Sequence, residues 1–198
     1  MNTAMRIEMN YDDMWLPRWR WETEDKIAVC SMDDHAASFA PDVASHLSEV
    51  LREFSLPLRI EMGNQRLNAL VRRLADEASD GNEIVCLRFL DAIDNQRQRE
   101  SDLHPALAIA FDGSTRKLRA PPGSNPNERA EWGWTDVSGL VLLRLCPGVL
   151  LRNVVRHEVG HLLGIGKHHP RCVMSWACSG EKFCESCINK IRDICRIC

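Results

Sequence analysis

The motif HEVGH at residues 157–161 constrains this 198-residue chain more than any other feature. In a helix, His157 and His161 project from the same face one turn apart, so both imidazoles can reach one tetrahedral zinc ion. Glu158 lies about 100° further around the helix and can reach a zinc-bound water instead of the metal. A solvated helix face is the plain alternative. However, buried polar groups need partners, and the flanks indicate a buried helix because they are apolar: Val154, Val155, Val159, Leu162 and Leu163.

A catalytic zinc ion needs a third protein ligand and one open position. In the extended pattern H-E-x-x-H-x-x-G-x-x-H, the third histidine would stand where this chain has Lys167, which keeps its proton at neutral pH and is a poor ligand. Gly164 can end the helix, and with Gly166 it can absorb a one-residue insertion. We therefore predict His168 as the third ligand, with His169 as its competitor.

Six of the nine cysteines lie after residue 171. The N-terminal stretch MNTAMRIEMNYDD has no apolar run like that of a signal peptide, so we expect a cytoplasmic protein. Clustered cysteines in such a chain indicate zinc ligands before disulfides. The segment 167–198 is too short and too rich in cysteine to build a core, which predicts that metal holds it. Met174 is expected to form the turn beneath the histidine site.

Charge and hydropathy exclude two classes of partner. A net charge of −3 gives no support for nucleic-acid binding. No apolar run approaches the roughly 18 residues that a membrane span needs. The best candidate, GLVLLRLCPGVLL, is interrupted by Arg144 and Pro147. We expect neither a nucleic acid nor a membrane as partner.

Helical and strand patterns alternate along the chain. Apolar spacing predicts a helix beginning at Pro41, and Asn64 is a plausible N-cap for a second helix. The active-site helix is expected at about 149–163. Short apolar or alternating runs predict strands at 27–30, 56–62, 84–90, 106–111 and 139–145. This order predicts an α/β domain with a twisted, largely parallel sheet packed with helices.

Three regions follow from these patterns. Residues 1–26 form an irregular N-terminal segment whose rings, at Trp15, Trp19 and Trp21, are expected to anchor it on the domain surface. Residues 27–166 form the α/β core, and residues 167–198 carry the Met174 turn, the zinc ligands and a C-terminal helix. Residues 91–105 are expected to be a polar loop, and 113–136 a long loop that borders the functional site.

Several motifs together resemble the archaemetzincins. These are HEVGHLLG, the pair His168-His169, Cys172-Val173-Met174, and FCESC at 183–187 followed by a basic helix. The resemblance covers residues 150–192. It implies a zinc peptidase with one catalytic and one structural zinc ion, and a sheet whose antiparallel edge strand pairs with the substrate. We assign residues 139–145 as that edge strand. The chain departs from the family because His169 stands where the family has a cysteine.

The resemblance also suggests ligands for the structural zinc ion. The gap from His169 to Cys172 equals the gap from Cys184 to Cys187, so these four residues can form a Cys₃His site. Cys178 is a competing fourth ligand. In another arrangement, Cys195 and Cys198 join Cys184 and Cys187 and leave Cys172 free, or they remain a reduced tail.

The leading hypothesis is a zinc-dependent metallopeptidase that acts on a peptide or protein substrate. Glu158 would take a proton from the zinc-bound water and pass it to the leaving amine. A second hypothesis is a non-catalytic, zinc-stabilised binding module with a degenerate site, which Lys167 and the shifted histidine favour. A third, thiol–disulfide chemistry at the Cys-x-x-Cys pairs, lacks a surrounding βαβ redox context.

Overall fold

The computed structural model describes residues 26–99, 106–119, 132–136, 138–166, 170–175 and 180–197, with side chains described up to residue 194. Within these residues a five-stranded sheet has the order β2-β1-β5-β8-β7. All neighbours pair in parallel except β7 and β8, which are antiparallel. The strands are β1 (Lys26–Ser31), β2 (Arg59–Met62), β5 (Ala106–Asp112), β7 (Gly133–Thr135) and β8 (Leu140–Leu145).

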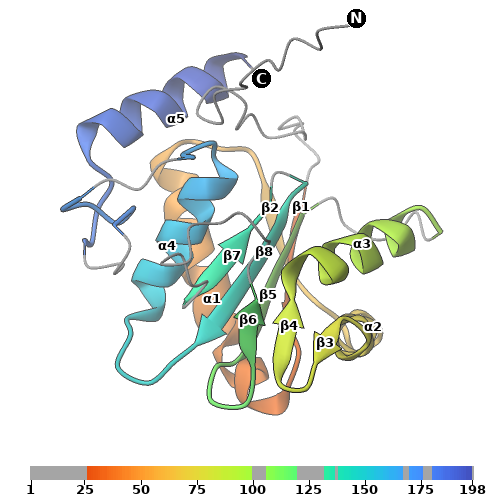
Figure 1. Ribbon diagram of the computed structural model, residues 1–198. Coiled ribbons are helices and arrows are strands. Elements are labelled where there is room, and N and C mark those ends of the chain that lie inside the picture. The colour runs from red at the N-terminus through yellow and green to blue at the C-terminus, as the bar shows by residue number, and fades with distance from the viewer. Residues whose placement is uncertain are drawn as a thin grey trace, which may run out of the picture.

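Helices cover both faces of this sheet (Figure 1). On β5, Ala106, Ala108 and Ala110 face the core formed with α1 (Asp34–Glu53) and α4 (Leu151–Leu162). The alternate residues Leu107 and Ile109 face the opposite core, formed with α2 (Gln65–Glu77) and α3 (Cys86–Arg97). Because successive side chains of a strand point to opposite faces, both faces of the sheet are buried. The predicted α/β class, mostly parallel with an antiparallel edge, is confirmed.

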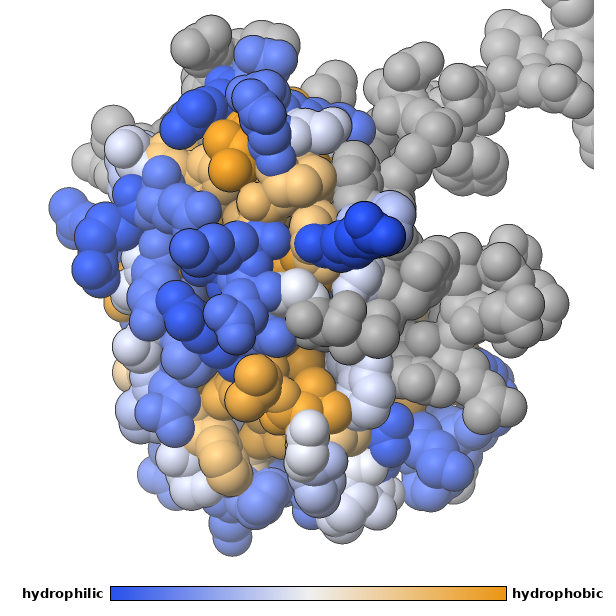
Figure 2. All heavy atoms as spheres, turned by 90° about the vertical axis from the view of Figure 1, so that its left-hand side faces the viewer, coloured by the Kyte–Doolittle hydropathy of each residue, from blue (hydrophilic) through white to orange (hydrophobic). Residues whose placement is uncertain are grey.

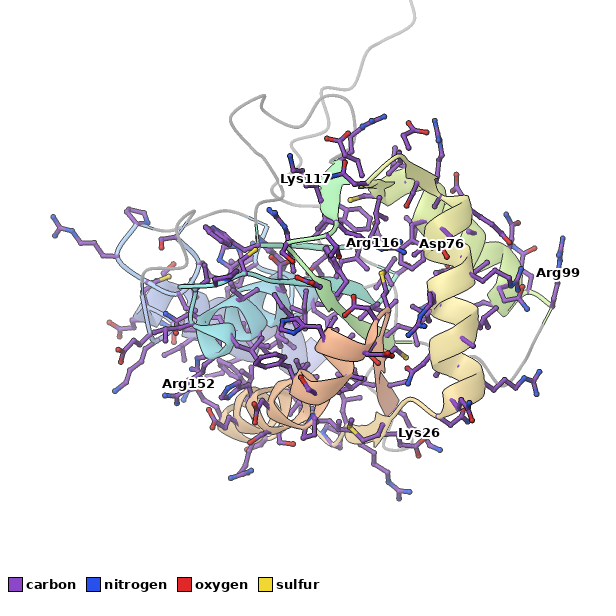
Figure 3. The ribbon with its side chains drawn as sticks, turned by 90° about the horizontal axis from the view of Figure 1, so that it is seen from below. Lys26, Asp76, Arg99, Arg116, Lys117 and Arg152 are labelled. Carbon is purple, nitrogen blue, oxygen red and sulfur yellow. The ribbon has the colours of Figure 1, made fainter. Side chains whose placement is uncertain are left out.

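A second, three-stranded sheet lies beside α2 and α3. It joins β3 (Ser79–Asp80), β4 (Glu83–Val85) and β6 (Lys117–Arg119) in the order β3-β4-β6. Just before β6, Arg116 points toward α2, where its guanidinium pairs with Asp76 at 2.5 Å (Figure 3). This ion pair ties the segment after β5 to the α2 side of the molecule.

Several predicted elements match closely. The strand expected at 106–111 is β5, and the active-site helix expected at about 149–163 is α4. Asn64 caps α2 as predicted, since its side chain accepts a hydrogen bond from the backbone N–H of Leu67 at 2.9 Å. α2 stops at Glu77, and Gly81 and Asn82 form the turn between β3 and β4.

Other predictions about local structure are wrong. The first helix begins at Asp34 instead of Pro41, because the Asp33 carboxylate caps it through the N–H of Ala36. The run 84–90 is not one strand: α3 begins at Cys86 and continues through the expected polar loop to Arg97. Its buried residues Cys86, Phe89 and Ile93 follow helical spacing. The expected loop 113–136 contains the short strands β6 and β7.

The prediction that residues 139–145 form the sheet edge is also wrong. β8 lies inside the sheet, parallel to β5 on one side and antiparallel to β7 on the other. The antiparallel edge is β7, a three-residue strand. The alternation of apolar and polar residues did not predict β7, because the strand is short and follows a long segment rich in Pro, Gly and Asn.

The C-terminal helix α5 (Glu185–Ile197) packs on the α1/α4 core through Cys187 and Ile191, and Phe183 joins the same core. Apolar contacts therefore help to hold this segment, and the prediction that metal holds it stays a prediction.

Figure 2 shows the side of the molecule on which α4 and α5 lie, with apolar areas separated by a hydrophilic band. Leu150, which is 64% exposed, lies at the N-terminal end of α4 beside a hollow that Phe39 and Leu151 also line. His161 lies near the other end of this helix, and His157 lies one turn before it. Within the described residues, none of the helices combines the length and apolar character needed to cross a bilayer.

Candidate metal and catalytic site

The packing of α4 fixes the HEVGH motif in place. Val155 and Val159 are fully buried in the α1-side core, and α4 also contacts β7 and β8. His157 and Glu158 are themselves 5% and 4% exposed. The motif therefore lies in a dry environment, as the apolar flanks predicted.

Both histidines are oriented by backbone carbonyls. Nδ1 of His157 lies 2.9 Å from the carbonyl oxygen of Val173, and Nδ1 of His161 lies 2.6 Å from that of Ile165. A carbonyl only accepts, so each Nδ1 carries the donated proton. The lone pair of each neutral ring is then on Nε2, which is the arrangement of second-shell contacts that metal-ligating histidines usually have.

The two Nε2 atoms lie 3.1 Å apart. Two neutral rings with protonated Nδ1 atoms bring two lone pairs together at this distance, which a shared cation would relieve. Two nitrogens bound to one tetrahedral zinc ion would be about 3.3 Å apart. Burial lowers the pKa of His157, although the contact with Val173 opposes this shift, so that ring favours its neutral, metal-binding form. The histidine pair therefore fits zinc.

The carbonyl of Ile165, which accepts the hydrogen bond of His161, is positioned by the turn that ends α4. Gly164 has φ +95°, a conformation that favours glycine. The N–H of Gly164 donates to the carbonyl of His161 at 2.9 Å, and that of Ile165 donates to Gly160 at 3.0 Å. This pair of hydrogen bonds is a Schellman motif. The predicted helix stop at Gly164 is confirmed, and it also directs the Ile165 carbonyl to His161.

Glu158 points to the edge strand. Its Oε2 lies 2.6 Å from the hydroxyl of Thr135 on β7, which also lies 3.1 Å from the backbone oxygen of Glu158. A Cβ added to Gly133 would come within 2.6 Å of Oε1. Glycine at this position therefore makes room for the carboxylate between α4 and β7.

Burial raises the pKa of Glu158 to about 7, and the hydrogen bond from Thr135 opposes that shift. A carboxyl group with a pKa near neutrality is suited to general acid and base chemistry, because it both accepts and releases a proton close to working pH. This shift is compatible with proton transfer by Glu158, and that role stays a prediction.

The side chain of Met174 packs against α4 at Gly160, the residue just before His161. A Cβ on Gly160 would lie 2.3 Å from its Sδ and 2.9 Å from the ring of Phe183. Gly160 is therefore the close-approach point between the helix and the segment that follows it. The role of Met174 as a turn beneath a metal-binding histidine site stays a prediction.

Three cysteines gather beside this turn. The Sγ atoms of Cys172, Cys184 and Cys187 all lie within 4.8 Å of one another. Cys184 and Cys187 are 3.5 Å apart, and Cys172 and Cys187 are 3.9 Å apart. Sulfurs on one tetrahedral zinc ion would be about 3.8 Å apart. The cluster fits metal, and it includes Cys172, which one of the predicted arrangements had left free.

The thiols differ in acidity. Burial opposes ionisation of Cys184, but hydrogen bonds from Cys187 and Cys172 outweigh it and lower the pKa. Burial, together with the contact from Cys184, raises the pKa of Cys187. Cys30 and Cys86, buried in the opposite core, have pKa values raised by burial to about 12 and remain inert thiols.

Some predicted ligands lie outside the described residues. These are His168 and His169, the competitors for the third position of the histidine site, with Cys178 and Cys198; the side chain of Cys195 is also not described. The fourth position of the cysteine cluster therefore stays a prediction.

Sequence reasoning missed the residues that support the histidines and Glu158. Thr135 and Gly133 lie more than twenty residues before Glu158, and only the pairing of β7 with β8 brings them near it. Val173 and Ile165 contribute backbone carbonyls, which no side-chain motif can reveal. The Gly-Trp-Thr triplet near Trp132 was the available signal, but it does not by itself indicate a site.

Comparison with known proteins supports the fold and leaves the family open. No protein-family model matches the sequence, and no curated protein matches it significantly. The structure is similar to the crystal structure of archaemetzincin from Methanopyrus kandleri, with a TM-score of 0.61 and 16% sequence identity over 88% of this chain and 97% of that chain. At this level of identity, the match shows that the chain has an archaemetzincin-like fold.

Proposed function

We propose that this protein is a zinc-dependent metallopeptidase. The observation that carries the proposal is the pair of Nε2 atoms facing each other at 3.1 Å, each with its Nδ1 held by a carbonyl, beside a buried carboxylate of raised pKa. The archaemetzincin-like fold supports the same activity. His157 and His161 would hold the catalytic zinc ion, with His168 as the proposed third ligand and His169 as the alternative.

Zinc in this position would supply Lewis-acid chemistry, because it polarises a carbonyl and acidifies a water molecule. Glu158 acts as the general base that removes a proton from the attacking water, and then returns it to the leaving amine. The hydroxyl of Thr135 donates to Oε2 of Glu158 and orients the carboxylate. Oε1 is then the oxygen that would face the water molecule. The low exposure of Glu158 keeps competing water away from this exchange.

The edge strand β7 favours an extended peptide as substrate. It pairs with β8 on one side and is the last strand of the sheet in the described residues. A peptide that adds to this edge would run beside Gly133 and Thr135, the two residues that contact Glu158. Glu158, the proposed general base, would then face the backbone of the bound peptide.

Cys172, Cys184 and Cys187 would hold a second, structural zinc ion, with His169 as the proposed fourth ligand and Cys178 as its competitor. A site closed by four protein ligands has no open position and supplies stability without catalysis.

The test is the variant Glu158→Gln, which keeps the shape of the side chain but cannot take a proton. We expect peptide hydrolysis to fall by about 10²- to 10⁴-fold while both zinc ions remain bound. Glu77→Gln, on the exposed end of α2, serves as the control and should retain full activity. Peptidase activity in Glu158→Gln equal to that of the control would refute the proposal. One tight zinc ion that survives His157→Ala, without hydrolysis in the parent protein, would instead favour the binding module.

A further inference from the structure

Three consecutive residues connect the two candidate metal sites. The Sγ of Cys172 belongs to the cysteine cluster, 3.9 Å from that of Cys187. The carbonyl of Val173 accepts the Nδ1 proton of His157 at 2.9 Å. The side chain of Met174 lies against Gly160 of α4, and its N–H donates to the sulfur of Cys172 at 3.3 Å. The turn therefore contacts the cysteine cluster through Cys172 and the candidate zinc ligand His157 through Val173.

The segment that holds this turn also carries the other two cysteines. The N–H of Val173 donates to the carbonyl of Lys182 at 2.9 Å. The two backbones approach so closely that a Cβ on Gly180 would lie 2.2 Å from the carbonyl carbon of Cys172. Cys184 follows two residues after Lys182. A cation that draws Cys172 to Cys184 therefore holds both segments together and fixes the Val173 carbonyl.

The turn also contains a strained residue. Arg171 has φ +65°, an uncommon conformation for a residue with a side chain. Such a conformation persists only when the surrounding contacts enforce it. The residue after Arg171 is Cys172, whose sulfur belongs to the cysteine cluster. The conformation of the turn is therefore sensitive to the loss of that cluster.

His161 provides an internal comparison. Its acceptor, the carbonyl of Ile165, is fixed by the Schellman motif at the end of α4 itself. No cysteine takes part in that motif. Loss of order at the cysteine cluster should therefore release His157 and leave His161 in place.

We infer that the cysteine cluster positions His157, so that metal bound by Cys172, Cys184 and Cys187 strengthens metal binding at the histidine pair. Cys172 and the Val173 carbonyl are the positioning groups. The inference rests on the proposed function in one respect, since it assumes that the histidine pair binds metal. Losing a second-shell contact of this kind typically weakens metal affinity by 10- to 100-fold.

The test compares Cys184→Ser with Cys146→Ser, a thiol after β8 outside the cluster, in the full-length protein. Cobalt(II) is titrated into each, because visible d–d bands that develop without sulfur-to-cobalt charge transfer report tetrahedral binding at the histidines, whereas the charge-transfer bands report the cysteines. We expect Cys184→Ser to weaken cobalt binding at the histidine pair by at least about tenfold, while Cys146→Ser binds like the parent protein. Unchanged affinity in Cys184→Ser would overturn the inference.

A second measurement uses the unaltered chain, in case Cys184→Ser does not fold. The metal-free protein receives one equivalent of cadmium, which prefers thiolates, and nitrogen-15 NMR follows the Nδ1 protons of the two histidines. We expect the proton of His157 to become protected from exchange and that of His161 to change little. Equal behaviour of the two protons would also overturn the inference. If the parent protein binds no cobalt at the histidines, the proposed function fails, and the NMR result still decides whether the cluster positions His157.

Discussion

The two candidate metal sites are built in opposite ways. His157 and His161 lie on a helix whose apolar face is buried in the main core, and carbonyl contacts orient both rings. The three thiols come from a turn and from the start of α5, and of these only Cys172 and Cys187 are buried. Packing therefore prepares α4 and the acceptor of His161, whereas the acceptor of His157 lies on the turn at Cys172, and the cysteine cluster itself would be completed by metal. Under the proposed function, zinc would act as a reagent at the histidine site and as a structural staple at the cysteine site.

The largest expected effect comes from breaking the cysteine site. Cys184→Ser should lower hydrogen-exchange protection of the amides in 180–197 by about 10³-fold, or about 4 kcal/mol, because structural zinc supplies folding free energy. His157→Ala should leave those amides protected. Hydrogen exchange with peptide-level mass spectrometry measures both. Protection that survives in Cys184→Ser would show that Phe183 and Ile191 hold α5 without metal.

The second prediction concerns pH and the histidine site without its zinc ion. The folded protein keeps a proton on Glu158 up to about pH 7, whereas the unfolded chain releases that proton near pH 4.5. The folded state thus binds more protons between these values, and stability falls as pH rises through this window. His157 has the opposite shift, because its pKa is lowered, so it destabilises the fold as pH falls below its unfolded value.

Comparing Glu158→Gln with the parent protein cancels the contribution of His157. We expect Glu158→Gln to gain about 3 kcal/mol of stability relative to the parent between pH 4.5 and pH 8, from a shift of roughly 2.5 pH units. Urea unfolding after phenanthroline treatment, at several pH values, measures this difference. A stability difference that does not vary with pH would contradict the raised pKa of Glu158 and the burial that causes it.

The smallest effect tests the contact between β7 and α4. Gly133→Ala places a methyl group within 2.6 Å of Oε1 of Glu158 and should displace the carboxylate. We expect peptidase activity to fall by about 10²-fold, with both metals retained. The double variant with Glu158→Gln is the control, because Gly133→Ala should cost little once the base is gone. Equal losses in both backgrounds would mean that Gly133→Ala acts through the fold and not through Glu158.

Sequence reasoning found the parts of this molecule in which local pattern and tertiary packing agree. β5 and α4 are strongly patterned segments, and the turn after α4 has a positive φ angle, a conformation that favours glycine, at Gly164. It failed where a short segment depends on distant contacts. The strand β7 has three residues, and the run beginning at Ile84 was apolar enough for a strand yet folds mainly as α3.

The same division applies to the site. The histidines and Glu158 are readable because their spacing carries the chemistry. Thr135 and the Val173 carbonyl are not, since a hydrogen bond between residues 23 apart has no signature in a single sequence. The grouping of Cys172 with Cys184 and Cys187 was predicted from equal spacing, and the structure brings the three together.

The contact between Thr135 and Glu158 has a consequence for the life of the chain. The carboxylate of Glu158 is set in position only where the edge strand β7 docks beside α4. Under the proposed function, hydrolysis would depend on that docked strand, and local undocking of β7 would remove it while both histidines stay on their helix. A peptidase of this design would stay silent until its sheet edge is in place.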